Sequence, residues 1–334
     1  MLITLAAPAF AGTWYIENGD ITVKASGTEG KNKVSQGNNP EVEDTNTIIT
    51  NQKTDTASSH TVTIDAGNDK VEVTLDNVNI KAASGSALTS NGDVTLTLKG
   101  ENHLTGGNGD TYGGDGITSS GSLTISGGTV TATGGNSTDS VGSGGSGIYS
   151  VSGDVTISGG STVTANGGSG TISGGDGIRS DGGVTISGGT VNATGGNGGS
   201  LGGGDGIRSS SGGVTIPGGS TVTANGGNGG SIGGGSGIYS NGSLTISGGT
   251  VNANGGDGKN GSGGSGITSL GSLTISGGTV NAAGGSGKDG GDGSRSGGVT
   301  ISSGSTVTAN RGRGADGSGR HHITSDGGDS PISG

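Results

Sequence analysis

Short runs of alternating apolar and polar residues recur along most of the chain. Each copy opens with a Gly followed by an Ile, and successive copies begin 29 to 31 residues apart. We call these isoleucines the marker isoleucines; they are Ile117, Ile148, Ile178, Ile207, Ile238 and Ile267. A second run follows in each copy, such as residues 123–126. A Gly-Gly pair separates it from a third run, such as residues 129–132. Alternation with a period of two is typical of β-strands, so each copy predicts three short strands joined at glycine corners.

A single copy has too few apolar side chains to form a core of its own. In a stack of copies, however, Ile117 lies over Ile148 and Leu123 over Val155, so each apolar column is buried between its neighbours. A further copy begins at Leu88, and a less regular one has Ser294 in place of the Ile. We therefore predict an all-β fold, a right-handed parallel β-helix of about eight coils over residues 87–310.

Glycine changes this picture, because 86 of the 334 residues are Gly and only 25% are hydrophobic. So few apolar residues exclude one large core, and Gly does not recur at every third position as a collagen triple helix requires. Many glycines fall in loop insertions of about a dozen residues between copies. Because Gly loses much conformational entropy when it becomes ordered, we expect these Gly-rich loops to stay mobile.

Three segments lie outside the regular copies. Residues 1–11 are apolar and end in Ala9-Phe10-Ala11, a small-x-small pattern typical of secretory cleavage sites, so we interpret them as a truncated signal peptide. Residues 12–86 contain strand-like runs without the repeat, which predicts an N-terminal cap and irregular first coils, with a long polar loop over 27–55. Residues 311–334 are polar, and we expect a disordered or truncated tail there.

Charge and hydropathy restrict the location and the partners. The export pattern predicts an extracellular protein, either secreted or attached to the cell surface. Nowhere does the sequence approach the roughly 20 consecutive apolar residues of a membrane span. A net charge of -11 argues against nucleic acid as a partner. The sequence contains no Cys, which excludes disulfides and thiolate metal sites.

Several motifs resemble those of a known family. Residues 12–23 (GTWYIENGDITV), 73–80 (VTLDNVNI) and 92–98 (GDVTLTL) are similar to segments of secreted clostridial proteins. Together with the repeats, they resemble the right-handed β-helix carbohydrate-binding family over residues 12–283. The resemblance implies a bacterial surface protein that binds acidic polysaccharide, such as pectin or polygalacturonate, and holds calcium. Ser146, Ser236 and Ser265 stand where that family has the Asp of an Asp-Gly-Ile motif.

One outward column carries candidate ligand-binding residues. The residue after each marker Ile points outward, and four consecutive copies have Tyr149, Arg179, Arg208 and Tyr239 at this position. Aromatic faces suit sugar rings, and guanidinium groups suit bidentate contacts with carboxylates. An acidic oligosaccharide therefore fits this strip. The alternative is that duplication copied tolerated surface residues, with each Arg stacked on a neighbouring Tyr.

Two residues before the marker Ile lies a column that carries acidic side chains in several copies. Oxygen ligands on successive coils can hold calcium, and Asp115 is the member without a basic companion, which makes it the candidate metal ligand and calcium the candidate cofactor. Where Arg follows the marker, as at Arg179 and Arg208, the acid is Asp176 or Asp205. Local Asp and Arg pairs explain that pattern without a metal.

Catalysis has little support in the sequence. Many acids lie in loops, which hold reacting groups poorly, and His60, His103, His321 and His322 lie outside the regular copies. We therefore expect a non-catalytic surface module that binds polysaccharide. The alternative is a structural stalk or adhesin region without a specific glycan ligand.

Overall fold

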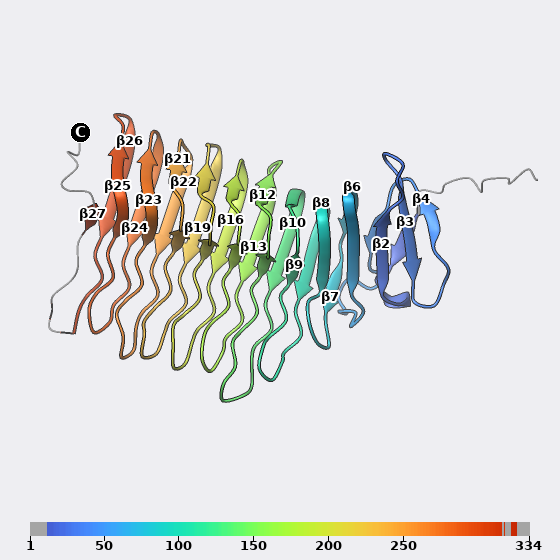
Figure 1. The fold of residues 1–334 in the computed structure, drawn as a ribbon, viewed down its shortest axis with the longest axis horizontal. Coiled ribbons are helices and arrows are strands. Elements are labelled where there is room, and N and C mark those ends of the chain that lie inside the picture. Colours follow the sequence, from blue (N-terminus) through green and yellow to red (C-terminus); the bar gives the residue numbers. More distant parts are fainter. Residues whose placement is uncertain (1–11, 316, 318–321, 326–334) are drawn as a thin grey trace, which may run out of the picture.

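The computed structural model describes residues 12–315, 317 and 322–325. The chain winds into a parallel β-solenoid of about nine turns (Figure 1), which confirms the predicted all-β parallel β-helix. The segment interpreted as a signal peptide, residues 1–11, lies outside the described residues. Within them, the structure has no helix that is long and apolar enough to cross a membrane.

Each regular turn has three strand positions, and equivalent positions stack into three faces. The first face contains β9 (Ile117–Ser119), β11 (Ile148–Ser150), β14 (Ile178–Ser180), β17 (Ile207–Ser209) and β20 (Ile238–Ser240). The second contains β12 (Val155–Ser158), β15 (Val184–Ile186), β18 (Val214–Ile216) and β21 (Leu244–Ile246). The third contains β13 (Thr162–Asn166), β16 (Gly189–Thr194), β19 (Ser220–Asn225), β22 (Thr250–Asn254), β24 (Gly278–Ala283) and β26 (Ser305–Asn310). Four longer strands continue through a corner: β8 (Leu88–Thr105), β10 (Leu123–Thr133), β23 (Ile267–Ile275) and β25 (Ser294–Ile301).

The core is a set of columns that run along the solenoid. Ile148 pairs with Ile178, and Ile178 pairs with Ile207, in the register expected from the sequence. All three side chains are fully buried. The first-face strands also point a Ser inward, and its hydroxyl donates to a corner carbonyl, as from Ser180 to Gly153 at 2.7 Å. Aliphatic packing and these short polar bonds together fix the register of the first face.

The N-terminal part departs from the predicted long loop. Its elements are β1 (Thr13–Tyr15), the 3-10 helix η1 (Ile16–Asn18), β2 (Ile21–Ala25), β3 (Asn32–Gln36), β4 (Val42–Asp44), β5 (Ile48–Thr50), β6 (Val62–Asp76) and β7 (Asn79–Lys81). β3 pairs antiparallel with β2 and β4, so residues 27–55 contain short paired strands joined by turns instead of one long loop. β6 pairs in parallel with both β2 and β8. The parallel ladder therefore extends well before residue 87.

The parallel ladder also continues past the predicted boundary at residue 310. β27 (Ile323–Ser325) pairs in parallel with β25, and Ile323 lies opposite Ser294. Residues 323–325 repeat the Ile-x-Ser pattern of the first face, a signal that the polar composition of the surrounding segment obscures. The rest of the expected tail, namely 316, 318–321 and 326–334, lies outside the described residues.

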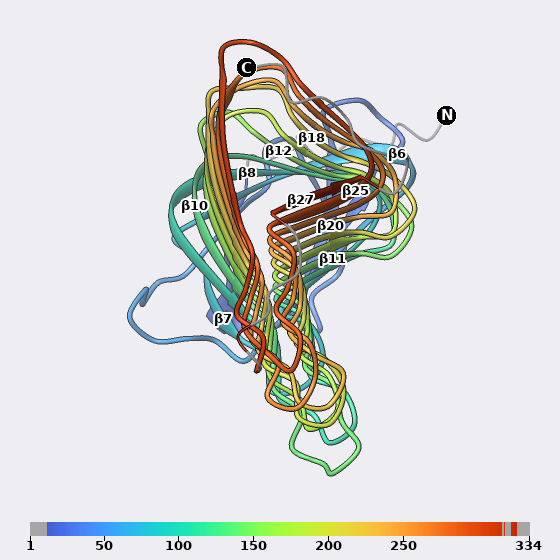
Figure 2. The same cartoon turned by 90° about the vertical axis from the view of Figure 1, so that its left-hand side faces the viewer.

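The Gly-rich loops, which we expected to be mobile, form a regular hydrogen-bonded stack. Each loop from the third face to the next first-face strand has an outgoing and a returning arm, and the loops stack into a narrow projection (Figure 2). We call this projection the glycine fin; its layers are residues 106–116, 134–147, 167–177, 195–206, 226–237, 255–266 and 284–293.

Backbone hydrogen bonds join the arms of the glycine fin within and between turns. The Gly135 N–H donates to the Gly114 carbonyl at 2.7 Å, the Gly145 N–H to Gly135 at 2.9 Å, and the Gly168 N–H to Gly145 at 2.7 Å. The arms pack so closely that a Cβ on Gly135 would overlap the carbonyl oxygen of Gly107. The fin is therefore an ordered lattice of backbone that only Gly allows at such positions.

Candidate ligand-binding site

The candidate column lies on four consecutive strands of the first face. Tyr149 on β11 pairs with Arg179 on β14, Arg179 with Arg208 on β17, and Arg208 with Tyr239 on β20. In each strand the residue lies between a buried Ile and a buried Ser, so its side chain points outward. We call these four residues the Tyr–Arg strip. Neighbouring members are about 4.8 Å apart along the solenoid.

Each guanidinium of the strip lies over an aromatic ring. The Arg179 guanidinium carbon is 4.7 Å from the centre of the Tyr149 ring, and that of Arg208 is 4.7 Å from the centre of the Tyr239 ring. Both distances are within the range of cation–π attraction. The strip is therefore two stacked pairs, with the two Arg side chains side by side at its centre and 37% of each side chain exposed.

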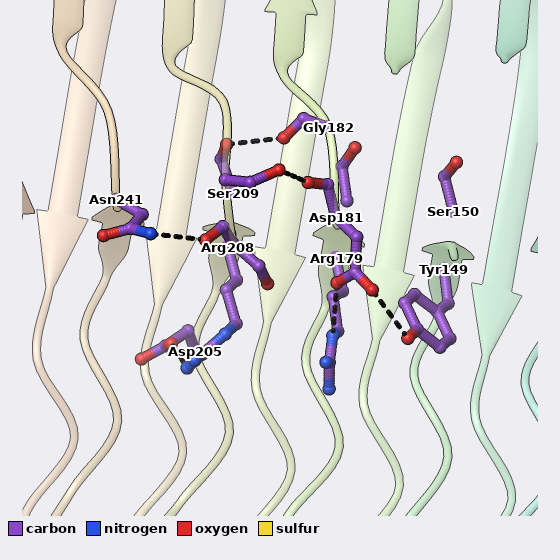
Figure 3. A network of polar contacts seen from close by, with 12 residues as sticks. Tyr149, Ser150, Arg179, Asp181, Gly182, Asp205, Arg208, Ser209 and Asn241 are labelled. Atoms are coloured by element: carbon purple, nitrogen blue, oxygen red, sulfur yellow. Dashed lines mark hydrogen bonds and ion pairs between the residues drawn. The ribbon is translucent and has the colours of Figure 1, made fainter. Parts of the chain in front are cut away.

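Acidic side chains of neighbouring residues in the solenoid form hydrogen bonds and ion pairs with the strip (Figure 3). The Tyr149 hydroxyl donates to Oδ2 of Asp181 at 3.3 Å, and Nε of Arg179 lies 3.5 Å from Oδ1 of the same residue. Nη1 of Arg208 donates to Oδ2 of Asp205 at 3.0 Å. The expected pair of Arg208 with Asp205 is thus confirmed, whereas the ion pair of Arg179 is with Asp181.

Asp181, which lies in the corner after β14, was not predicted from the repeat pattern. In the other Tyr or Arg copies this position holds Val151, Ser210 or Asn241. The signal available was the Arg-Ser-Asp order at 179–181, where an acid two residues after the Arg lies on the same side of the strand. The spacing of three residues to Asp176 matched the other Arg copies, but in the structure that acid lies deeper.

Asp176 and Asp205 are buried at the junction of the glycine fin and the first face. Oδ1 of Asp176 accepts the Asp205 backbone N–H at 2.7 Å, and Oδ1 of Asp205 accepts that of Ser236 at 2.6 Å. Burial, with the Asp205 charge beside it, raises the pKa of Asp176 from 3.8 to about 7. Burial also raises the pKa of Asp205, although Arg208 opposes that shift. The charge beside the strip therefore changes near neutral pH.

Asp115 occupies the same place in an earlier turn. Its Oδ1 accepts the backbone N–H of Ser146 at 2.6 Å, and its Oδ2 accepts the Thr118 hydroxyl at 2.6 Å. Burial raises the pKa of this carboxyl. Among the described residues, the structure contains no group of three or more His, Asp or Glu side chains that could hold a metal ion. These contacts show how Asp115 joins adjacent turns, and calcium stays a prediction.

One comparison with known proteins agrees with this architecture. The family described as a beta helix repeat matches residues 123–147, 184–207, 244–266 and 273–292. The chain is a parallel β-helix repeat protein. Comparison with curated proteins and with solved structures gave no match. The matched segments of this β-helix repeat protein cover second-face strands, third-face strands and parts of the glycine fin, so the fin belongs to the repeat itself.

Proposed function

We propose that this β-helix repeat protein is a non-catalytic bacterial surface module that binds polysaccharide through the Tyr–Arg strip. The observation that supports the proposal is the alignment of Tyr149, Arg179, Arg208 and Tyr239 in one outward column. The resemblance of residues 12–283 to secreted carbohydrate-binding proteins points the same way. The rigid β-sheet beneath the strip limits the entropy lost when a ligand binds.

The free edges of the guanidinium groups suit a carboxylate of an acidic glycan. Among the described residues, the two Nη atoms of Arg179 have no hydrogen-bond partner, and Nη2 of Arg208 has none either. The two side chains are neighbours on adjacent turns, so one carboxylate can bridge them. Arg stacking holds the guanidinium planes in place before the ligand arrives. We therefore favour a polyuronate over a neutral glucan.

The net charge of -11 opposes long-range attraction of a polyanion. Binding must therefore come from short-range contacts at the strip, and we expect weak affinity per site. A glycan array with polygalacturonate, esterified pectin and a neutral glucan tests this proposal. The double variant R179A/R208A should lose polyuronate binding. Arg295→Ala, which removes an Arg from the same outward column outside the strip, should retain it and serves as the matched control.

The pH dependence provides a second test of the same site. Because the pKa of Asp176 is about 7, its carboxyl becomes neutral as the pH falls from 8 to 6. The strip then loses a nearby negative charge, while the carboxylates of a polyuronate stay ionised. Polygalacturonate binding should therefore strengthen toward pH 6 by about threefold to tenfold. Isothermal titration at both pH values, with Asp176→Asn as the insensitive control, measures this change.

Three outcomes would redirect the proposal. Unchanged binding in R179A/R208A would exclude the strip as the site. Loss of binding in a chelator would support calcium, with Asp115 the first residue to substitute. The stalk or adhesin alternative is favoured by the internal pairing of the strip with Asp181 and Asp205, and it would stand if no glycan binds.

A further inference from the structure

Exposed apolar side chains gather at the tip of the glycine fin. Tyr112, Val141, Leu201 and Ile232 are among the large hydrophobic residues with the greatest exposure, and Ile232 is 66% exposed. Leu201 and Ile232 follow Ile172 in successive turns. The Leu201 N–H donates to the Ile172 carbonyl at 2.9 Å and the Ile232 N–H to the Leu201 carbonyl at 3.3 Å. We call Ile172, Leu201 and Ile232 the apolar ridge.

Charged side chains continue the apolar ridge at both of its ends. The two preceding turns carry Asp110 and Asp139 at the tip, joined by a backbone bond from the Asp139 N–H to the Asp110 carbonyl at 3.1 Å. The two following turns carry Lys259 and Lys288. All four side chains are exposed, and within the described part of the chain they form no ion pair. The turns with Asp110 and Asp139 form the acidic end of the tip, where Tyr112 and Val141 are also exposed, and the turns with Lys259 and Lys288 form its basic end, where Asp257 and Asp289 are exposed as well.

We propose that two copies of this chain associate through their fin tips, antiparallel and about a two-fold axis at Leu201. This axis places Leu201 against its own copy and Ile172 against Ile232. It also places Asp139 opposite Lys259 and Asp110 opposite Lys288. The Leu201 pair lies on the axis and occurs once, and every other pair occurs twice, as an interface between identical surfaces requires. The order of residues along the fin thus pairs the apolar ridge with itself and the two Asp side chains with the two Lys side chains, while Tyr112 and Val141 lie opposite the Lys turns.

Two further features agree with this arrangement. The loops of the acidic end reach further from the strands than those of the basic end (Figure 1), and layer 134–147 is longer than layer 284–293. An inverted copy therefore brings long loops opposite short ones. Asp289 lies beside Lys288, but it accepts a hydrogen bond from the Ser262 hydroxyl at 3.3 Å within its own fin. The ridge is narrow, so the dimer should be weak and dependent on concentration.

Sedimentation velocity over a series of protein concentrations tests the proposal. The wild-type chain should shift from monomer toward dimer as concentration rises. Leu201→Glu should abolish the shift, because it places two like charges at the axis. Leu270→Glu, at another exposed apolar side chain (52% exposed) away from the fin, is the matched control and should leave the shift unchanged. A wild-type chain that stays monomeric throughout would overturn the proposal.

A charge exchange tests the orientation of the two copies. Lys259→Glu opposes Asp139 twice in the dimer, so it should raise the dissociation constant by about tenfold. The double variant Lys259→Glu with Asp139→Lys should restore it. Absence of this rescue would overturn the antiparallel pairing. Flotation with zwitterionic vesicles addresses a different partner: flotation of monomeric wild type that Leu201→Glu abolishes would assign the ridge to a lipid surface and overturn the dimer.

Discussion

The strands and the glycine fin follow the same turns of the solenoid, yet different forces hold them together. In the strands, aliphatic side chains such as Ile178 and Val191 are fully buried between their copies. In the fin, the turns contact one another through backbone, and hydrogen bonds such as Gly196 N–H to Gly175 carbonyl at 2.7 Å replace side-chain packing. One repeat thus combines a hydrophobic core with a layer that gains its order from hydrogen bonding.

This difference explains the unusual composition. The strands need only a few aliphatic residues per turn, because each column is continued by the turns above and below it. The fin needs Gly at each contact between its arms, because a side chain there would meet a carbonyl oxygen. A chain with 86 Gly and 25% hydrophobic residues can therefore be ordered in both regions.

The largest expected effect is in the strands. Ile178→Asp buries an unpaired carboxylate between Ile148 and Ile207, and should destabilise the fold by about 4 kcal/mol or more. Ile232→Asp makes the same change at an exposed position of the fin and should cost less than about 0.5 kcal/mol. Denaturant unfolding, at a protein concentration low enough to exclude association, measures both. Equal losses would refute the distinction between core and fin.

An intermediate effect is expected inside the fin. Gly175→Ala adds a Cβ that overlaps the carbonyl oxygen of Gly145, so the two arms must separate. We expect a loss of about 1 to 3 kcal/mol, as for overpacked cores. Gly298→Ala is the matched control, because the nearest atom to its added Cβ is the Ser272 hydroxyl at 4.0 Å. If both variants were as stable as the wild type, the fin would not be a packed lattice.

The register of the strands was accessible from the sequence, whereas the order of the fin was not. The column of Ile117, Ile148 and Ile178 follows from alternation and spacing alone, because burial selects one face of each strand. Order in the fin depends on the distance between two arms, which composition does not report. The available signal was the Gly pair at the same place in every copy, such as Gly134-Gly135 and Gly167-Gly168.

The candidate site was also predictable only in part. The alignment of the Tyr–Arg strip follows from the repeat, but its acidic partners depend on side-chain reach. Asp205 lies close enough to bond Arg208, whereas Arg179 lies beside Asp181 in the corner. The antiparallel pairing of β3 with β2 and β4 was missed because β3 and β4 are mostly polar and follow no repeat, which leaves no periodic signal.

The smallest expected effect lies at the junction of the two regions, at Asp176. Its pKa is about 7 in the fold and 3.8 in the reference state, so between these values the folded chain holds a proton that the unfolded chain has lost. Stability from this group is therefore full below pH 3.8 and is lost as the pH rises through 7. Asp176→Asn keeps an oxygen for the Asp205 N–H and cannot ionise.

The Asn variant should therefore be more stable than wild type at pH 8, by about 1 kcal/mol, because desolvation of the buried Asn amide offsets part of the gain. The gain should shrink toward pH 5, where the wild-type carboxyl is already neutral. Asp257→Asn is the matched control, since this exposed fin residue accepts the Ser286 N–H at 2.7 Å in the same way. Thermal unfolding at several pH values compares the three proteins. A constant difference between wild type and Asp176→Asn across this range would show that the junction does not titrate, and that burial at the base of the fin leaves this carboxyl charged as it is in water.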